Sequence, residues 1–207
     1  LLRINTLYQP NSLEILLWTV LFFTIIKFIN SENNKWLYFA SLTFAVGFLN
    51  KYNITFLILG LLPALLLTRH RKVFFNKHLY LSLIAALIII APNLIWQYQN
   101  DFPVFHHLKT LSETQLANVN RFDFFKEQLL FPIGGLFVLI LAFISFVNYA
   151  PFKKYQIFFW SYIFTIAIFT IFKAKGYYAF GLYPILLAFG SVYLEMLLAK
   201  GWLRHVR

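Results

Sequence analysis

Two lysines and two tyrosines follow a long apolar run near the C-terminal end of the chain. Lys173 and Lys175 flank Ala174, and Tyr177 and Tyr178 come shortly after. Lysine ammonium groups supply positive charge and tyrosine hydroxyls supply hydrogen-bond donors, a combination that suits a lipid phosphate where screening is weak. The alternative is that the lysines snorkel to the membrane interface and the tyrosines form an aromatic belt.

Glu14 lies one turn inside the first apolar run, in PNSLEILLW (residues 10–18). A carboxylate at that depth is costly unless it has a function or a partner, so Glu14 is a candidate active-site residue. Asn11 precedes it at the spacing of a capping box, in which Glu14 would satisfy backbone donors of the first helical turn. The two interpretations are compatible, because a capped carboxylate at a helix end can still face a cavity.

Lys51 lies in a polar corner, residues 50–53, that interrupts an apolar segment. An ionisable residue in this position has to reach either a cavity or the membrane surface, and short or broken membrane helices commonly line cavities. Lys51 is therefore a candidate ligand of an anionic substrate. The alternative is a lysine at a helix C-terminus that stabilises the last carbonyl groups.

Weaker candidates follow PNLIWQYQNDFPVF (residues 92–105). His106 and His107 come directly after it, and Arg121 lies further along. Each can contact a phosphate or diphosphate, or be an ordinary solvated loop residue. Adjacent histidines point to different faces of a helix, and no further ligand stands at zinc-motif spacing, so no metal site is predicted. The sequence contains no cofactor or nucleotide-binding motif, and it leaves a divalent metal open.

The composition indicates which elements must carry these residues. Of the 207 residues, 60% are hydrophobic and 12% are charged, with a mean hydropathy of +0.70, far from the values of a soluble domain. The net charge of +11 lies in short segments between apolar runs, which is typical of membrane topology and not of a nucleic-acid surface. The absence of cysteine leaves the redox compartment open. We therefore predict an all-α, polytopic transmembrane helical bundle that forms a single domain over residues 1–207.

Apolar runs that reach or approach the length of a membrane-spanning helix define five spans, at residues 11–29, 79–96, 129–148, 157–172 and 177–199. Residues 36–67 are too long for one span, and the polar corner divides them into two short ones. The sequence thus predicts about seven crossings. The connection at residues 97–128 is polar with scattered Phe and Leu, which indicates amphipathic helices on the membrane surface.

The distribution of Lys and Arg predicts the orientation, because cytoplasmic loops are enriched in basic residues. With residue 11 facing outward, 11 of the 18 basic residues fall on the inner side, and the C-terminus is cytoplasmic. These inner residues are Lys27, Lys35, Arg69, Arg71, Lys72, Lys77, Lys153, Lys154, Lys200, Arg204 and Arg207. The other 7 lie outside, at Arg3, Lys51, Lys109, Arg121, Lys126, Lys173 and Lys175. Basic residues are normally depleted on the outer side. Seven of them there indicate an anionic ligand on that side.

Four segments resemble, in order, the motifs of a known enzyme family. They are PNSLEILLW (10–18), GFLNKYN (47–53), PNLIWQYQNDFPVF (92–105) and KAKGYYAFGLYP (173–184). Together they resemble bacterial members of the dolichyl-phosphate-mannose protein mannosyltransferase family, which includes the aminoarabinose transferase of lipid A. The resemblance implies a GT-C glycosyltransferase in the bacterial plasma membrane. Such an enzyme passes a sugar from a polyprenyl phosphate to a lipid, glycan or protein acceptor on the outer face.

The resemblance also implies roles. Glu14 matches a second acidic position of the active site, often Asp in relatives, and Lys51 matches the lysine of a Gly-x-x-x-Lys corner that faces the active site. The lipid-phosphate region is matched by either lysine and either tyrosine of KAKGYY (173–178). The family's main catalytic carboxylate, expected to be the general base of an inverting transfer, lies in an outer loop upstream of Leu1. We therefore expect a fragment that is catalytically incomplete.

Other functions stay open. A transporter or lipid flippase needs ionisable groups near mid-membrane and usually repeated halves, whereas most charges here lie at span ends and no repeat is visible. A scaffold that binds other membrane proteins is compatible with the same composition. The glycosyltransferase is favoured, and it requires Glu14, Lys51 and the KAKGYY segment to meet in one cavity on the outer face.

Overall fold

The computed structural model describes residues 9–114 and 120–199, which form helices and their connections with no strand among them. The α-helices are α2 (Asn11–Ser31), α3 (Lys35–Asn50), α4 (Ile54–Leu67), α5 (Lys77–Gln99), α6 (Pro103–Thr114), α7 (Arg121–Leu130), α8 (Leu136–Asn148), α9 (Gln156–Ile171) and α10 (Tyr183–Leu198). Short 3-10 helices connect several of them, namely η1 (Arg69–Phe75), η2 (Ile133–Gly135), η3 (Ala150–Tyr155) and η4 (Gly176–Leu182).

Several helices are long and apolar enough to cross a membrane. They are α2, α5, the continuous segment Ala150–Ile171 and the continuous segment Gly176–Leu198, with 21 to 23 residues each. Two bent pairs, α4 with η1 and α7 with α8, raise the number within the described residues from 4 to as many as 6. The prediction of an all-α, multi-pass membrane protein is confirmed.

The predicted number of seven crossings exceeds this range because some of the helices are short. Each of the seven predicted runs does contain a helix, but α3 has 16 residues, α4 has 14 and α8 has 13. At about 1.5 Å per residue, α3 extends roughly 24 Å, which is less than the roughly 30 Å of a hydrocarbon core. The division of residues 36–67 into two short helices is confirmed.

The predicted span at residues 129–148 is wrong in its first part. Helix α7 ends at Leu130, α8 begins at Leu136, and the two are bent by 55°. Pro132 has no backbone N–H to donate, and Gly134 and Gly135 have poor helix propensity, so these residues interrupt the helix. The helices expected in the connection 97–128 are present as α6 and α7.

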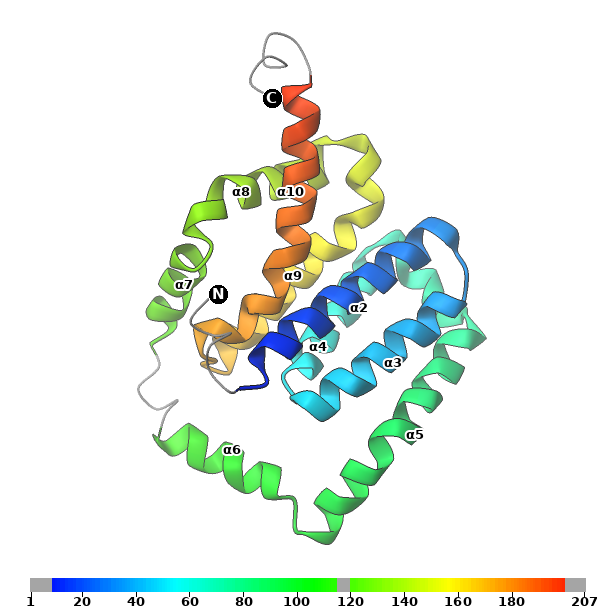
Figure 1. The fold of residues 1–207 in the computed structure, drawn as a ribbon, viewed down its shortest axis with the longest axis vertical. Helices are drawn as coiled ribbons and strands as arrows, with labels where there is room; N and C mark the ends of the chain where they lie inside the picture. The colour runs from blue at the N-terminus through cyan, green and yellow to red at the C-terminus, as the bar shows by residue number, and fades with distance from the viewer. Residues whose placement is uncertain (1–8, 115–119, 200–207) are drawn as a thin grey trace.

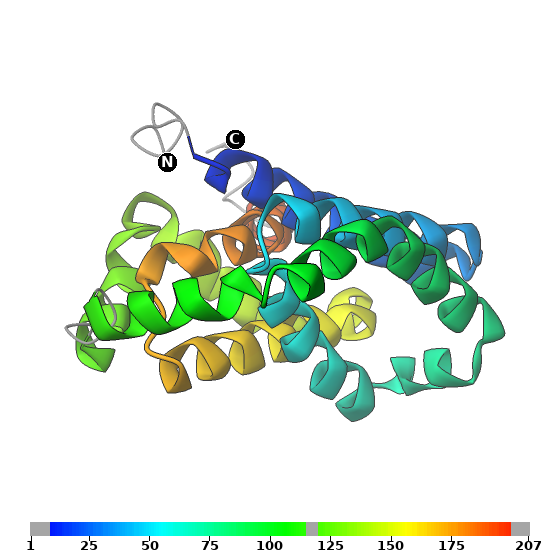
Figure 2. The same cartoon turned by 90° about the horizontal axis from the view of Figure 1, so that it is seen from below.

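The helices pack as neighbours in space that are often distant in sequence. Helix α2 packs against α3, α3 against α5, α4 against α9, and α8 against α10 (Figure 1). Seen from below, α2 and α3 lie on one side of the molecule and α9 lies on the other (Figure 2). The close α4–α9 contact depends on a small residue, because a Cβ at Gly60 would collide with the Thr165 hydroxyl.

Aromatic rings fill much of the core between these helices. Trp18, Phe146 and Phe169 are fully buried, and Phe22 meets Phe158 edge to face with 5.5 Å between the ring centroids. Lipid provides no hydrophobic drive for helix association, so close packing of such large side chains has to supply the cohesion.

Polar contacts gather at the two ends of the bundle. At one end, α2 and α4 begin while α3 and α5 end, and we name this the corner end. Lys51, after α3, bonds to Asn11 at the start of α2, and Tyr52 bonds to Asn93 near the end of α5. At the opposite end, the Asn30 side-chain oxygen accepts hydrogen bonds from Lys154 Nζ (2.6 Å) and the Tyr155 hydroxyl (2.7 Å). Asn76 Nδ2 donates to Asn34 Oδ1 there at 2.6 Å. Successive helices from α2 to α5 thus run in alternating directions, as in an up-and-down bundle.

Candidate functional site

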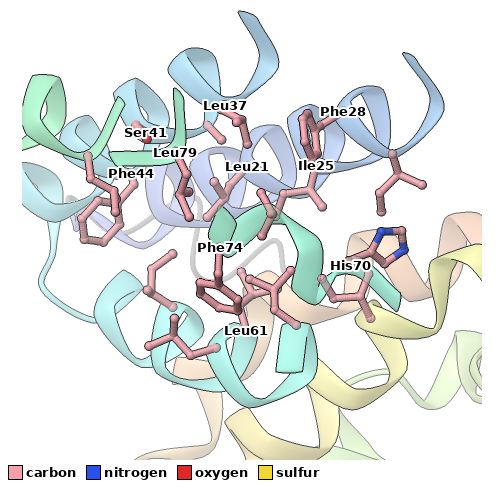
Figure 3. A pocket seen from close by; sticks show the side chains of 18 of the residues that line it. Leu21, Ile25, Phe28, Leu37, Ser41, Phe44, Leu61, His70, Phe74 and Leu79 are labelled. Atoms are coloured by element: carbon pink, nitrogen blue, oxygen red, sulfur yellow. The ribbon is translucent and has the colours of Figure 1, made fainter. Parts of the chain in front are cut away.

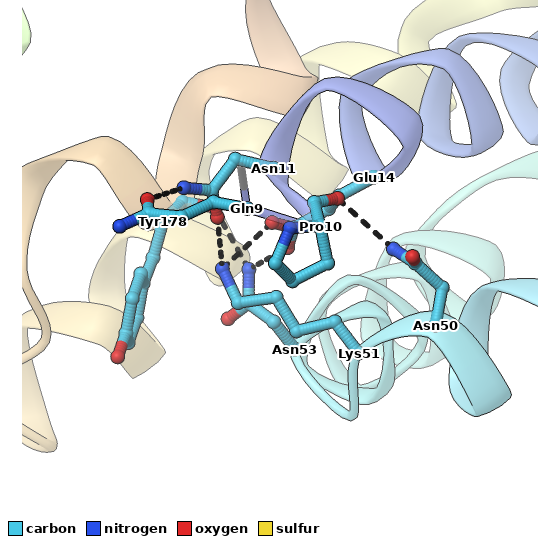
Figure 4. A network of polar contacts seen from close by, with 8 residues as sticks. All are labelled: Gln9, Pro10, Asn11, Glu14, Asn50, Lys51, Asn53 and Tyr178. Atoms are coloured by element: carbon cyan, nitrogen blue, oxygen red, sulfur yellow. Dashed lines mark hydrogen bonds and ion pairs between the residues drawn. The ribbon is translucent and has the colours of Figure 1, made fainter. Parts of the chain in front are cut away.

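An ion pair joins the start of α2 to the end of α3 (Figure 4). Lys51 Nζ lies 2.7 Å from Glu14 Oε2 and donates a second hydrogen bond to Asn11 Oδ1 at 2.9 Å. Glu14 is 6% exposed, and the Lys51 side chain is 21% exposed. The carboxylate is therefore enclosed by protein, whereas the ammonium retains a path to the surface.

Asn53 connects this pair to the C-terminal part of the chain. Its Nδ2 atom donates to Glu14 Oε1, and also to the backbone oxygen of Tyr178 at 3.1 Å. With Lys51 on Oε2 and Asn53 on Oε1, both carboxylate oxygens of Glu14 accept hydrogen bonds. Such an arrangement stabilises the ionised carboxylate and fixes its orientation.

The rings of two tyrosines lie against the Lys51 ammonium. Nζ is 4.6 Å from the ring centroid of Tyr178 and 5.4 Å from that of Tyr177. Both distances fall within the range of a cation–π interaction. We name the set Asn11, Glu14, Lys51, Asn53, Tyr177 and Tyr178 the corner cluster.

The capping-box interpretation of Glu14 is wrong. Pro10, not Asn11, precedes the first turn of α2 as its N-cap, and no side chain caps the helix. Asn11 has already entered the helix, so its side chain is free to meet Lys51, and Glu14 turns toward Lys51 and Asn53. Lys51 does follow the last residue of α3, but its ammonium contacts these side chains across the bundle.

A second polar contact ties the corner to α5. The Tyr52 hydroxyl donates to Asn93 Oδ1 at 2.8 Å and accepts from Gln97 Nε2 at 3.0 Å. Gln97 Oε1 in turn accepts from the backbone N–H of Val104, at the start of α6. Helix α5 continues past Pro92 to Gln99, so the end of α5 and the start of α6 are held at the corner end.

A third contact anchors the start of the η4–α10 segment, which carries the two tyrosines. Gln128 is buried at the end of α7, and its Nε2 atom donates to the backbone oxygen of Gly176 at 3.1 Å. The Tyr183 hydroxyl donates to Gln128 Oε1 at 2.6 Å. Sequence reasoning missed Asn53, Gln97 and Gln128. Asn53 carried a signal, since it belongs to the same polar corner as Lys51.

The remaining candidates lie elsewhere. His106 and His107 are exposed on α6, which buries none of its residues, and neither side chain bonds to the corner cluster. They lie on a helix, so the alternative of loop residues does not describe them. Arg121 is exposed, and its Nε atom donates to the backbone oxygen of Thr170 at 3.2 Å, at the end of α9. This contact joins α7 to α9 rather than to Glu14.

The two lysines of KAKGYY differ in their surroundings. Lys173 is exposed just after α9, with a left-handed backbone of φ 51°. Lys175 is half-buried and immediately precedes η4. Among residues 9–114 and 120–199, no group of three or more His, Asp or Glu side chains is arranged to hold a metal ion.

The fold and its enclosed polar cluster define a multi-pass α-helical membrane protein. Residues 1–96 match the family described as dolichyl-phosphate-mannose-protein mannosyltransferase, which is slightly less than half of the 207 residues. No curated protein and no solved structure matches the chain. The family match suggests a membrane glycosyltransferase. The matched part includes Glu14, Lys51 and Asn53 and ends before Tyr177 and Tyr178, which the fold brings to them.

Proposed function

We propose that this protein is a GT-C glycosyltransferase of the bacterial plasma membrane. It moves a sugar from a polyprenyl-phosphate donor to a lipid, glycan or protein acceptor on the outer face, where the corner end lies, and its C-terminus is cytoplasmic. One observation carries the proposal. The Lys51 ammonium, in the part that matches the family, lies 4.6 Å from the ring centroid of Tyr178, in the other half of the chain.

Lys51 is assigned to the phosphate of the donor. An ammonium that is partly enclosed acts on an anion with less screening than one in bulk water, and its 21% exposed side chain leaves it accessible. The leaving phosphate gains negative charge as the bond to the sugar breaks, so a fixed cation beside it stabilises the transition state.

Glu14 is assigned as a positioning residue and not as the general base. Both of its carboxylate oxygens already accept hydrogen bonds, from Lys51 and Asn53. Each oxygen has a second lone pair, so these bonds alone do not prevent proton transfer. A base must, however, lie within hydrogen-bond reach of the acceptor, and Glu14 is only 6% exposed. Glu14 instead holds the Lys51 ammonium in one place, as the partner groups of catalytic side chains commonly do.

The tyrosines and lysines of the η4 region complete the assignment. The Tyr177 and Tyr178 hydroxyls supply hydrogen-bond donors to the phosphate or the sugar. Lys173 and Lys175, which lie just before η4, add positive charge. His106, His107 and Arg121 are left as residues of the outer surface, available to the headgroup or the acceptor but outside the corner cluster.

The proposed sugar transfer is a substitution reaction and needs neither an oxidant nor a reductant. A heteroatom of the acceptor forms a bond to the anomeric carbon of the sugar while the bond between that carbon and the phosphate oxygen breaks. The polyprenyl phosphate leaves with the electron pair, and the acceptor proton passes to a base other than Glu14. This step requires no cofactor. It is also compatible with a divalent metal ion that binds the phosphate.

The sugar and acceptor are identified by mass spectrometry of envelope lipids and glycans from a strain that lacks the complete gene. Membranes that contain the complete protein are then assayed with the matching polyprenyl-phosphate sugar. We expect Lys51→Gln to lower the transfer rate by roughly 100-fold or more, the usual cost of removing one group that stabilises transition-state charge.

Lys109→Gln is the matched control, because it removes an exposed lysine of α6 on the same predicted side, and we expect an unchanged rate. Full activity of Lys51→Gln would refute the assignment of Lys51. Movement of lipid or solute across vesicles that contain the complete protein, without any sugar transfer, would replace the glycosyltransferase by the transporter or flippase alternative.

A further inference from the structure

An apolar pocket lies away from the corner cluster, between α2, α3, α4, η1 and α5. Its volume is about 400 Å³, within the roughly 300–1,000 Å³ of ligand pockets. Leu21, Phe44, Leu61 and Phe74 are among its walls (Figure 3). Nearly every lining side chain is hydrocarbon, and the hydroxyl of Ser41 is engaged with Ser82 at 2.9 Å. The pocket therefore suits an aliphatic chain rather than a polar ligand.

A polar cavity adjoins the apolar pocket. A second cavity of about 510 Å³ shares four lining residues with the first, namely Phe28, Ile29, His70 and Val73. Its other walls are Glu32, Arg69, Lys72 and Asn76. His70 lies at one end of the apolar pocket in Figure 3. A ligand that extends through both cavities would have a hydrocarbon part and a polar head.

The charges at this polar mouth favour an anion. Arg69 and Lys72 are exposed, and neither forms an ion pair with a described residue. Glu32 is the one carboxylate among the described residues that line the same cavity. His70 is occupied, since its Nε2 atom lies 2.6 Å from the backbone oxygen of Lys154. Two cations against one carboxylate leave the mouth with positive charge.

The geometry of η1 places this mouth at a membrane surface. Helix η1 is bent by 108° from α4, so it runs across the bundle rather than along it. It combines the basic residues Arg69, Arg71 and Lys72 with Phe75, which is 90% exposed. A short segment with basic and aromatic side chains at the end of a membrane helix is typical of the headgroup region.

We propose that these two cavities bind an anionic glycerophospholipid, with an acyl chain in the apolar pocket and the phosphate of the headgroup against Arg69 and Lys72. The site is separate from the proposed transferase site. Glu14 and Lys51 lie at the start of α2 and the end of α3, whereas the mouth lies near the end of α2 and at η1. The bound lipid is thus a resident of the opposite leaflet and not the sugar donor.

Native mass spectrometry of the complete protein in detergent tests this. Phosphatidylglycerol and phosphatidylethanolamine with identical acyl chains are titrated, and we expect phosphatidylglycerol to bind more tightly. Arg69→Gln with Lys72→Gln should weaken it by at least about tenfold, at roughly fivefold per cation near an anionic headgroup. The matched control is Arg71→Gln with Lys77→Gln, which removes two exposed charges near the mouth that line neither cavity.

A second variant separates the acyl-chain pocket from the charges. Ala40 lines the apolar pocket, so Ala40→Phe should fill it and weaken both lipids while leaving the charged mouth unchanged. Equal binding of the two lipids, an equal loss in the control variant, or displacement by polyprenyl phosphate but not by phosphatidylglycerol would overturn the proposal. Unchanged lipid binding by Ala40→Phe, with thermal stability retained, would also overturn it, because the acyl chain would then lie elsewhere.

Discussion

The Glu14 carboxylate and the Lys51 ammonium lie 2.7 Å apart, although 37 positions separate them in the chain. Each is an ionisable residue near the end of an apolar helix, where a single charge is expensive. Together they lower that cost, because each supplies the charge and the hydrogen bonds that the other requires. This pairing makes the start of α2 and the end of α3 one structural unit.

Removing the lysine alone is expected to destabilise the protein. Lys51→Met leaves the buried carboxylate with Asn53 as its described partner, and breaking an enclosed pair in this way costs about 3–5 kcal/mol. Adding Glu14→Gln should restore part of the lost stability, since the uncompensated charge is then gone. The free energy of unfolding in mixed micelles, measured for both single variants and the double variant, gives the coupling. Additive losses would show that the two side chains do not interact.

A second prediction concerns the contact between η4 and α2. A Cβ at Gly181 would meet the ring of Trp18, which is fully buried. Gly181→Ala should therefore cost about 1–3 kcal/mol of unfolding free energy through overpacking. Because η4 also carries Tyr177 and Tyr178, the same change should displace their rings from Lys51 and lower sugar transfer.

Gly134→Ala provides the comparison for that variant. A Cβ at Gly134 meets no described atom within 4 Å, so its stability should stay within about 0.5 kcal/mol of the parent protein. If the two alanine variants were equally stable, the Trp18 contact would not limit the approach of η4.

A third prediction separates two roles of Lys173. Its φ of 51° is unfavourable for a lysine, and the turn it forms lets the Ala174 N–H donate to the Phe169 oxygen at 2.8 Å, as in a helix C-cap where glycine is common. Lys173→Gly should thus raise the unfolding free energy by up to about 1 kcal/mol. If Lys173 binds the donor phosphate, the same variant should transfer sugar more slowly.

Lys173→Asn is the control for this pair of measurements, since asparagine also adopts the left-handed conformation but carries no charge. It should lose transfer activity to the same extent as Lys173→Gly. A glycine variant that is more stable and fully active would assign Lys173 to the membrane interface alone.

Hydrophobic runs were sufficient to predict most of the helices. The runs at residues 11–29, 79–96 and 157–172 correspond closely to α2, α5 and α9. The break between α7 and α8 was present in the sequence as Pro132 followed by Gly134 and Gly135, but the flanking apolar residues concealed it. A proline lacks the backbone N–H that a helix needs, and glycine has low helix propensity. Together they end the helix even within an apolar run.

The corner cluster was only partly predictable. Glu14 and Lys51 were singled out individually, because each is an ionisable residue in an apolar setting. Their pairing depends on how α2 packs against α3, and periodicity along one helix does not contain that information. Asn53 was missed although it belongs to the same polar corner as Lys51. Gln128, outside the cluster, was missed because a neutral amide stands out only when its partners are known.

The brevity of α3 has a further consequence. Its 16 residues fall short of a typical hydrocarbon core. A bilayer that α3 crosses therefore either thins around the helix or leaves one of its ends, such as the end at Lys51, below the level of the headgroups. Hydrophobic mismatch of this kind deforms the lipid locally and admits water and headgroups toward the helix end. The acyl-chain length of the surrounding lipid should therefore affect how far the Lys51 ammonium is exposed to water. A thick membrane would withdraw its ammonium from solvent, and a thin one would place it at the interface.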